Sequence, residues 1–310
     1  MQQRIYLPFV DRSSRLSMNL KPLSFEDWIE IDENFAFYLD CKRQLLEQCY
    51  AEVFASLPET QVAQTEVLDL LLEYLLVHFP QHYCQRGNQI ENLITNEVWR
   101  IEDFSENPLD LAGRLVQEDL CLLQLKSGRY QLNAASLCFP NHWRLHDKLG
   151  KPLAHIHEPV PGYAKDLEQP VDHLFDRLKF DHPVYRLNWG IADTPELFRG
   201  YVPDKTQKPD VSTLTVTNAG EKLWLRIERQ TLRRLEKSRD ILFMIRTYLY
   251  PLAILENDPI AARNLEKAIQ QLSPEMQAYK NILPFREILL KYLAIATSTP
   301  ASSFVPKASY

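Results

Sequence analysis

The fold is decided by residues 120–138, which read LCLLQLKSGRYQLNAASLC. Two mainly apolar runs of strand length, Leu120 to Lys126 and Arg129 to Cys138, flank the pair Ser127-Gly128. A Ser-Gly pair between two such runs is typical of a tight turn, so this segment predicts a β-hairpin.

The chain before the hairpin is predicted to be helical after an extended N-terminal arm. Apolar residues recur every three or four positions from Phe35 to Leu57 and from Val62 to Phe79, and a proline follows each segment. This spacing is that of two amphipathic helices, which we expect to form a helical hairpin. Asn107-Pro108 is typical of a helix start and predicts a short helix to about Gln117.

The chain after the hairpin alternates between helical and strand patterns. Helices are expected at residues 141–149, at 163–178, and in two C-terminal segments between 258 and 296 that divide near Ser273-Pro274. Strands are expected at residues 184–191, 211–217, 222–230 and 240–250, with a hairpin turn at 218–220. Clustered strands with local hairpins favour an α+β fold, an antiparallel sheet with helices on one side, over a doubly wound parallel sheet.

Composition excludes several classes of protein. The 310 residues include 35 basic and 41 acidic ones, a net charge of -6 that does not favour nucleic acid as the main partner. No apolar run approaches the roughly 20 residues that span a bilayer, and the N-terminus lacks the order of a secretion signal, so we expect a cytoplasmic protein without membrane contact. The five cysteines are widely spaced without CxxC or CxxCH, which argues against disulfides, a zinc knuckle and covalent haem.

Residues 138–163, CFPNHWRLHDKLGKPLAHIHEPVPGY, contain four of the eight histidines and are the first place to expect chemistry. Histidine is the commonest neutral metal ligand, and prolines stiffen the backbone around it. His142 and His146 would share a helical face, and His155 and His157 could add two ligands, which would make a nonhaem metal centre. The alternative is that His142 and His146 are surface or cap residues.

The order of hairpin, crossover helices and antiparallel strands is that of a PAS-like domain. Together with the histidine-rich segment, three later motifs resemble the haem-dependent oxidative N-demethylase α-subunit family: VYRLNW at 184–189, LWLRIERQTLRRL at 223–235 and FMIRTYLYPL at 243–252. The resemblance is good over residues 119–252 and looser in the flanking helices. It implies three regions: an arm and helices at 1–118, a PAS-like haem-binding domain at 119–252, and C-terminal helices with a tail at 253–310, packed on the same globule.

The resemblance also implies an activity. Such subunits bind haem b noncovalently and oxidise a small methylated amine with dioxygen, releasing formaldehyde, and they receive electrons from separate flavin and iron-sulfur reductase subunits. A folate that takes up the released carbon is an additional cofactor to test. The alternatives are a haem-binding PAS-like sensor or interaction module without turnover, and the nonhaem metal enzyme built on the histidine cluster.

The axial ligand expected for the haem iron is His157, which lies in the family-like segment IHEPVPGY. The alternative role is a histidine that hydrogen-bonds the backbone of a tight loop. His155 is the competitor, since in extended chain it would share a face with His157. His173 would point away from the apolar stripe of its helix, so we expect it to be solvated.

The remaining candidates lie on the expected strands. Arg186 and Asn188 share a strand face and could hold a haem propionate or a polar substrate group. On residues 222–230, Arg226 and Glu228 share a face and must form an internal polar network or meet water. Because ERQT matches the family motif, a functional network is favoured. The catalytic candidates are Glu228, Arg226 and Tyr248, with Thr247 contributing. The cofactor-binding candidates are His157, His155, Arg186, Asn188 and Arg226.

Overall fold

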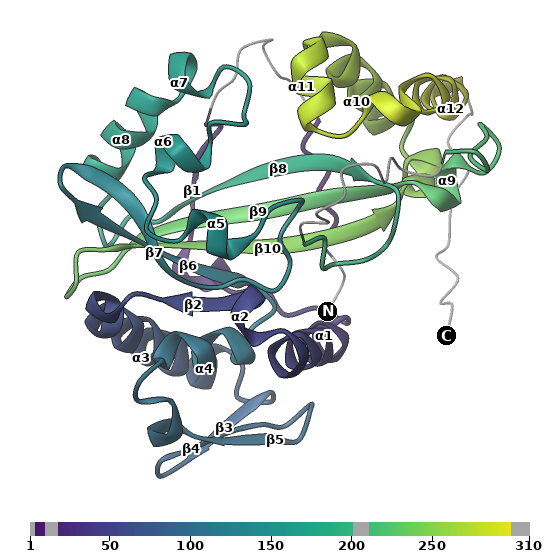
Figure 1. Cartoon of the computed structure of the whole chain (residues 1–310). Coiled ribbons are helices and arrows are strands. Elements are labelled where there is room, and N and C mark those ends of the chain that lie inside the picture. Colours follow the sequence, from purple (N-terminus) through teal and green to yellow (C-terminus); the bar gives the residue numbers. More distant parts are fainter. Residues whose placement is uncertain (1–3, 10–17, 201–210, 299–310) are drawn as a thin grey trace.

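The computed structural model describes residues 4–9, 18–200 and 211–298 and contains a seven-stranded antiparallel sheet (Figure 1). Its strand order is β1-β8-β9-β10-β6-β7-β2. The bounds are β1 Lys21–Pro22, β2 Phe54–Ser56, β6 Asp119–Lys126, β7 Arg129–Ser136, β8 Val184–Ala192, β9 Trp224–Arg234 and β10 Ile241–Pro251. Helices flank this sheet, so the predicted α+β class with an antiparallel sheet is confirmed.

The hairpin of β6 and β7 is confirmed, and its two turn residues explain why it forms. Ser127 and Gly128 both have positive φ, 50° and 75°. Two-residue hairpin turns of this kind need positive φ at both positions, because their backbone twist then matches the twist of the strands. Glycine adopts this conformation at almost no cost, so the Ser-Gly pair sets the register of the two strands.

Twelve α-helices lie among the described residues. Those before the hairpin are α1 Phe35–Gln48, α2 Tyr50–Val53, α3 Gln61–His78 and α4 Pro108–Leu115. Between the hairpin and β8 lie α5 Leu145–Lys148, α6 Leu153–Ile156, α7 Tyr163–Asp166 and α8 Glu168–Arg177. The later ones are α9 Ala219–Lys222, α10 Pro259–Gln271, α11 Pro274–Tyr279 and α12 Arg286–Ser298. Within the described ranges, none is long and apolar enough to cross a membrane.

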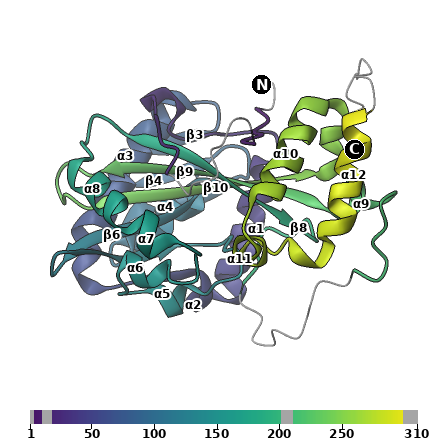
Figure 2. The ribbon, with the colours of Figure 1, turned by 90° about the horizontal axis from the view of Figure 1, so that it is seen from above.

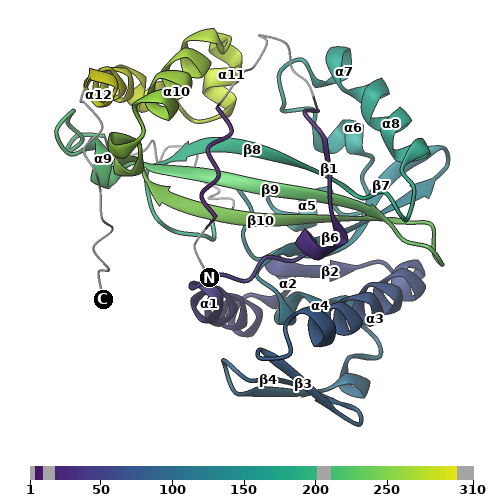
Figure 3. The same ribbon diagram turned by 180° about the vertical axis from the view of Figure 1, so that it is seen from behind.

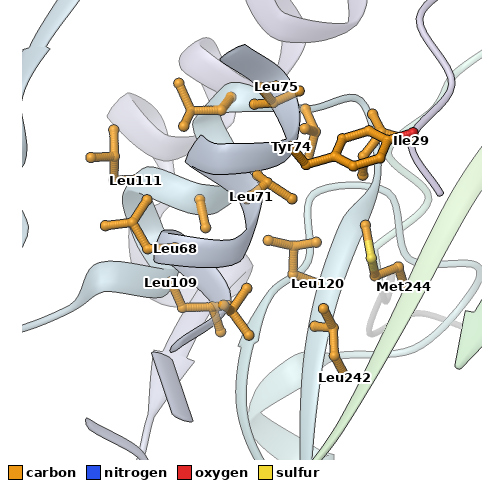
Figure 4. Close-up of a cluster of buried hydrophobic side chains, with 14 of the residues drawn as sticks. Ile29, Leu68, Leu71, Tyr74, Leu75, Leu109, Leu111, Leu120, Leu242 and Met244 are labelled. Carbon is orange, nitrogen blue, oxygen red and sulfur yellow. The ribbon is translucent and has the colours of Figure 1, made fainter. Parts of the chain in front are cut away.

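Helices cover both faces of the sheet, which corrects the expectation of helices on one side (Figures 1 and 2). On one face α3 and α4 pack through leucines such as Leu71 and Leu109 against Leu120 and Leu242 (Figure 4). On the other face α5, α6 and α8 pack against alternate residues of the same strands, including Cys121. The reason is that six consecutive residues of β6 are buried, so neither face of this strand can remain in water.

Three expected elements differ from the structure because local hydrogen bonds or strand pairing override the expected pattern. The helix expected from Phe35 to Leu57 breaks at Cys49, and its last part becomes β2, which pairs with β7. Residues 211–217 form turns instead of a strand, since the side chain of Asn218 bonds the backbone of Thr213 and Thr215. The hairpin turn expected at 218–220 is instead the start of α9.

Other segments were only partly predicted. The helix expected at 141–149 is reduced to α5, and the one at 163–178 is interrupted at Leu167 between α7 and α8. A three-stranded sheet was missed altogether: β3 Tyr83–Arg86, β4 Gln89–Asn92 and β5 Glu97–Arg100. The C-terminal tail from residue 299 lies outside the described residues.

The two ends of the described chain meet the sheet close to β8. The C-terminal helices α10 and α12 pack through Leu265 and Leu289 against Leu225 of β9. The N-terminal segment crosses β8, β9 and β10 on the face opposite α6, where Tyr6 contacts Tyr248 at 5.3 Å between ring centroids (Figure 3). As a result, the face of β8 to β10 between α6 and α11 is bordered by helices on two sides (Figure 1).

Candidate functional site

His157 ends α6, and its imidazole is held in one tautomer. Its Nδ1 lies 2.9 Å from the carbonyl oxygen of Leu153. Since a carbonyl can only accept, Nδ1 carries the proton and Nε2 of the neutral ring keeps its lone pair. Burial lowers the pKa of His157; the hydrogen bond to Leu153 opposes this shift, and the charges of Lys148 and Arg186 add to it. The ring is therefore a neutral nitrogen donor of the kind that binds iron.

The ring of Tyr163 fixes the plane of this imidazole. The two rings are stacked, with centroids 4.5 Å apart and planes 11° apart. Gly162 precedes Tyr163 with a φ of 81°, a left-handed conformation that lets the chain turn back over His157. The sequence pointed to His157 but not to Tyr163, because the position of Tyr163 depends on this turn.

The competing histidines face solvent. The side chain of His155 is 58% exposed, with Nδ1 3.9 Å from the Glu158 carboxylate. His173 is exposed on α8, as expected. These positions favour His157 as the ligand for a buried metal, although the hydrogen bond from Nδ1 to the backbone also matches the alternative role given above.

The histidine cluster does not form a nonhaem metal centre. His142 precedes α5 with a φ of 61°, so it does not share a helical face with His146. In the part of the chain that the structure describes, no three His, Cys, Asp or Glu side chains could hold a metal ion together. Desolvation and the charges of Arg199 and Arg226 lower the pKa of His142 to about 4, opposed by Asp193.

Glu228 is the centre of a polar network on the face of β8 and β9. Asn188 lies opposite Glu228 in the register of the two strands, and Arg186 lies opposite Gln230. The side-chain amides of Asn188 and Gln230 donate to Glu228 Oε2 at 3.3 and 3.0 Å. The carboxylate retains 14% side-chain exposure, so it belongs to an internal network and also reaches solvent.

Arg226 is buried beneath this network. Its side chain is 2% exposed, and its two terminal nitrogens donate to the carbonyl oxygens of Leu197 at 3.1 Å and Phe139 at 2.6 Å. Its Nε lies 3.7 Å from Glu228 Oε1. Burial lowers the pKa of Arg226, whereas Glu228 acts to raise it.

The two β10 candidates lie on opposite faces of the sheet. Thr247 is paired with Glu228 and shares its face, whereas Tyr248 is paired with Ile227 and points to the other face. There the hydroxyl of Tyr248 donates to the carboxylate of Glu30. Tyr248 therefore does not join Glu228 in one site.

Two residues of α11 and its C-terminal end complete the site, and the sequence offered no signal for either. Lys280 donates to the carbonyl oxygen of Trp189 at 2.6 Å and lies 3.4 Å from Asn188 Oδ1. The ring of Tyr279 is half exposed, while burial and the charge of Glu228 raise the pKa of its hydroxyl. These contacts bring residues about ninety positions apart to one end of the network.

A haem, as the resemblance implies, would need a nitrogen ligand, a flat apolar surface and cations for its propionates. His157 supplies the first. Phe243, Ile245 and Leu249 alternate along β10 with Thr247, on the face where Glu228 of β9 lies, and their side chains are only partly buried. Over Gly190, a Cβ atom would meet nothing within 4 Å, so the face is open there.

The cations required are also present. Arg186 lies on β8, and Lys280 lies beside that strand. Arg186 is close enough to lower the pKa of His157. The residues present therefore fit a noncovalent haem.

A hollow of about 420 Å³ opens further along the same strands, where Trp224 is one of its lining residues.

One known protein family matches the part of the chain that contains all of these site residues. The family described as "Haem-dependent oxidative N-demethylase, alpha subunit-like" matches residues 19–290. The match includes the helices on both sides of residues 119–252, where the resemblance had been looser. It covers every candidate residue named above, and the chain therefore belongs to the haem-dependent oxidative N-demethylase, alpha subunit-like family.

Proposed function

We propose that this chain is a haem-binding subunit that oxidises an N-methyl group of a small amine with dioxygen. The observation that carries the proposal is the hydrogen bond from His157 Nδ1 to Leu153, which leaves Nε2 as a neutral donor. His157 would hold the haem iron, and Arg186 and Lys280 would pair with the propionates. When bound, haem b supplies the iron at which dioxygen is reduced.

Glu228 is the group proposed to bind the amine. A small methylated amine is a cation near neutral pH and donates through its N–H, which a carboxylate accepts. Glu228 Oε2 already accepts from Asn188 and Gln230, so Oε1 is the oxygen proposed for the substrate. The half-exposed ring of Tyr279 lies near Glu228 and could stack on the methylammonium group.

The overall reaction balances with an external electron source. An N-methyl group, dioxygen, two electrons and two protons give a carbinolamine and water, and the carbinolamine then breaks its C–N bond to release formaldehyde and the smaller amine. The sequence has no cysteine cluster for an iron-sulfur centre, so we assign the electrons to separate flavin and iron-sulfur subunits. The described residues offer no feature in favour of folate, and the proposed product is free formaldehyde.

The visible spectrum of the protein purified with haem supplied tests the binding step. A Soret band is expected, and its absence from folded protein would refute the proposal. His157→Ala should shift or abolish the band, while His155→Ala, a change two residues away on an exposed side chain, should leave it unchanged. If His155→Ala changed the band and His157→Ala did not, His155 would be the ligand of the iron.

Amine turnover tests the second step. With a surrogate electron donor, dioxygen consumption should depend on a methylated amine and yield formaldehyde in equal amount. Glu228→Gln should raise the KM for the amine, because a neutral amide attracts a cation less than a carboxylate does. Haem binding without amine-dependent dioxygen consumption would instead identify a sensor or interaction module.

A further inference from the structure

Three polar side chains converge beneath the site face of β9 and β10. Thr247 lies directly opposite Glu228 in the register of these strands, and Arg226 is two residues from Glu228 on the same face. Residues directly opposite in an antiparallel pair have Cβ atoms roughly 5 Å apart. Thr247 therefore lies beside the base of the Glu228 side chain.

Two of these side chains have a buried atom with an unmet hydrogen-bonding capacity. Thr247 Oγ1 and Arg226 Nε are inaccessible to solvent, and neither has a hydrogen-bond partner among residues 4–9, 18–200 and 211–298. Arg226 Nε and Glu228 Oε1 are 3.7 Å apart, which is too long for a direct hydrogen bond. Buried polar atoms in native proteins are almost always satisfied, so this gap calls for a ligand.

The course of Arg226 explains why Thr247 is covered. From β9 its guanidinium reaches the carbonyl oxygen of Phe139. The amide of Phe139 in turn donates to Asp119, which is paired with Ile245 on the far side of β10. The Arg226 side chain therefore extends across β10 and covers Thr247, with its terminal nitrogens held and Nε left toward Glu228.

We propose that one water molecule binds between Arg226 Nε, Glu228 Oε1 and Thr247 Oγ1. It accepts from Arg226 and donates to the other two oxygens, which gives it three partners, the usual number for a buried water. A polar gap longer than about 3.5 Å is where a bridging water is expected. An ammonium ion cannot accept from Arg226, and an anion would be repelled by Glu228, so the donors and acceptors select water.

This water gives Thr247 a role that rests on the proposed function. Asn188 and Gln230 hold Glu228 Oε2, and the water takes one of the two acceptor sites of Oε1, on the side that faces Arg226, which leaves the other site for the amine. Thr247 is thus a positioning residue, since it orients the proposed amine-binding carboxylate through the water. It is not expected to touch the substrate.

Urea unfolding of the haem-free chain tests the water itself. Thr247→Val keeps the shape and removes the hydroxyl, so the unfolding equilibrium constant should rise about tenfold. Thr231→Val is the matched control: Thr231 Oγ1 is also buried without a partner among the described residues, but its cross-strand neighbours are Tyr185 and Met244. Thr231→Val should leave the unfolding equilibrium constant unchanged or lower it. An equal result for both variants would overturn the proposal.

A high-resolution crystal structure and the amine kinetics complete the test. The crystal structure should show a water within hydrogen-bond distance of all three atoms, and a dry site would overturn the proposal. Thr247→Val should raise the KM for the amine several-fold at similar kcat, and Thr247→Ser should restore it; an unchanged KM would remove the positioning role. Failure of haem binding would refute the proposed function, while unfolding and crystallography would still decide on the water.

Discussion

The imidazole of His157 lies flat against the ring of Tyr163, with the ring planes only 11° apart. Combined with the hydrogen bond from Nδ1 to Leu153, this stack leaves the imidazole little freedom to rotate. One contact fixes the plane of the ring and the other fixes its tautomer. The direction in which Nε2 points is therefore fixed by contacts within the segment from α6 to α7.

Replacing Tyr163 should loosen this orientation. Tyr163→Leu removes the stack, worth about 0.5–1.5 kcal/mol, and is expected to weaken haem binding by up to roughly tenfold. Tyr163→Phe keeps the ring and should behave as the unchanged protein. Haem titration followed at the Soret band measures both, and equal weakening in the two variants would show that the hydroxyl, not the stack, matters.

His142 should make stability depend on pH. Its pKa is about 4 in the folded protein, below the ordinary value of 6.5, because of desolvation and the charges of Arg199 and Arg226, with Asp193 opposing them. The unfolded chain binds the proton more readily, so this contribution to stability is complete above about pH 6.5 and is lost as the pH falls toward 4.

Urea unfolding at several pH values between 4 and 7.5 measures this dependence. The variant His142→Asn suits the comparison, since asparagine tolerates the positive φ of 61° at this position. It should lose stability less steeply below pH 6.5 than the unchanged protein. Identical slopes would show that His142 is protonated equally in the folded and unfolded chains.

Removing the buried carboxylate of Asp119 should destabilise the chain strongly. Asp119 accepts from the amides of Cys138 and Phe139, both at 2.8 Å, and lies 3.7 Å from the buried ammonium of Lys42. Asp119→Ala would leave the buried Lys42 ammonium without its counter-charge, bonded to the carbonyl oxygens of Gly113 and Glu118, a loss of about 3–5 kcal/mol in the free energy of unfolding. Denaturant unfolding measures the loss; Lys291→Ala, which breaks an exposed ion pair with Glu287, should have no measurable effect.

Enlarging Gly190 should block the site without harming the fold. A Cβ at this position meets nothing within 4 Å, and Gly190 lies opposite Arg226 on the site face. Gly190→Leu is expected to keep its melting temperature and to bind haem and amine more weakly. Gly190→Ala is the control and should retain binding. Normal haem uptake by the leucine variant would place the haem elsewhere.

Periodicity along the chain was sufficient to predict which strand residues share a face. The alternation of β9 correctly grouped Arg226 with Glu228, and the Ser-Gly pair correctly predicted the hairpin of β6 and β7. Both are local properties, because side chains alternate along any strand and a turn involves only neighbouring residues. The family resemblance also followed from the sequence and is confirmed.

Residues far apart in the chain were brought together only by the tertiary structure. The pairing of β10 with β9 puts Thr247 beside Glu228 and turns Tyr248 to the other face, and the return of the chain after α11 brings Lys280 to Asn188. Strand β2 also exists only through its pairing with β7, which overrode a helical pattern.

The sequence by itself thus determined the fold class, the family and the region of the candidate ligand, since these depend on composition, period and motif. Only the tertiary structure decided the tautomer of His157, the membership of the Glu228 network and the gap beside Arg226. The physical reason is that each of these depends on a non-local register or contact, which no pattern along the chain encodes.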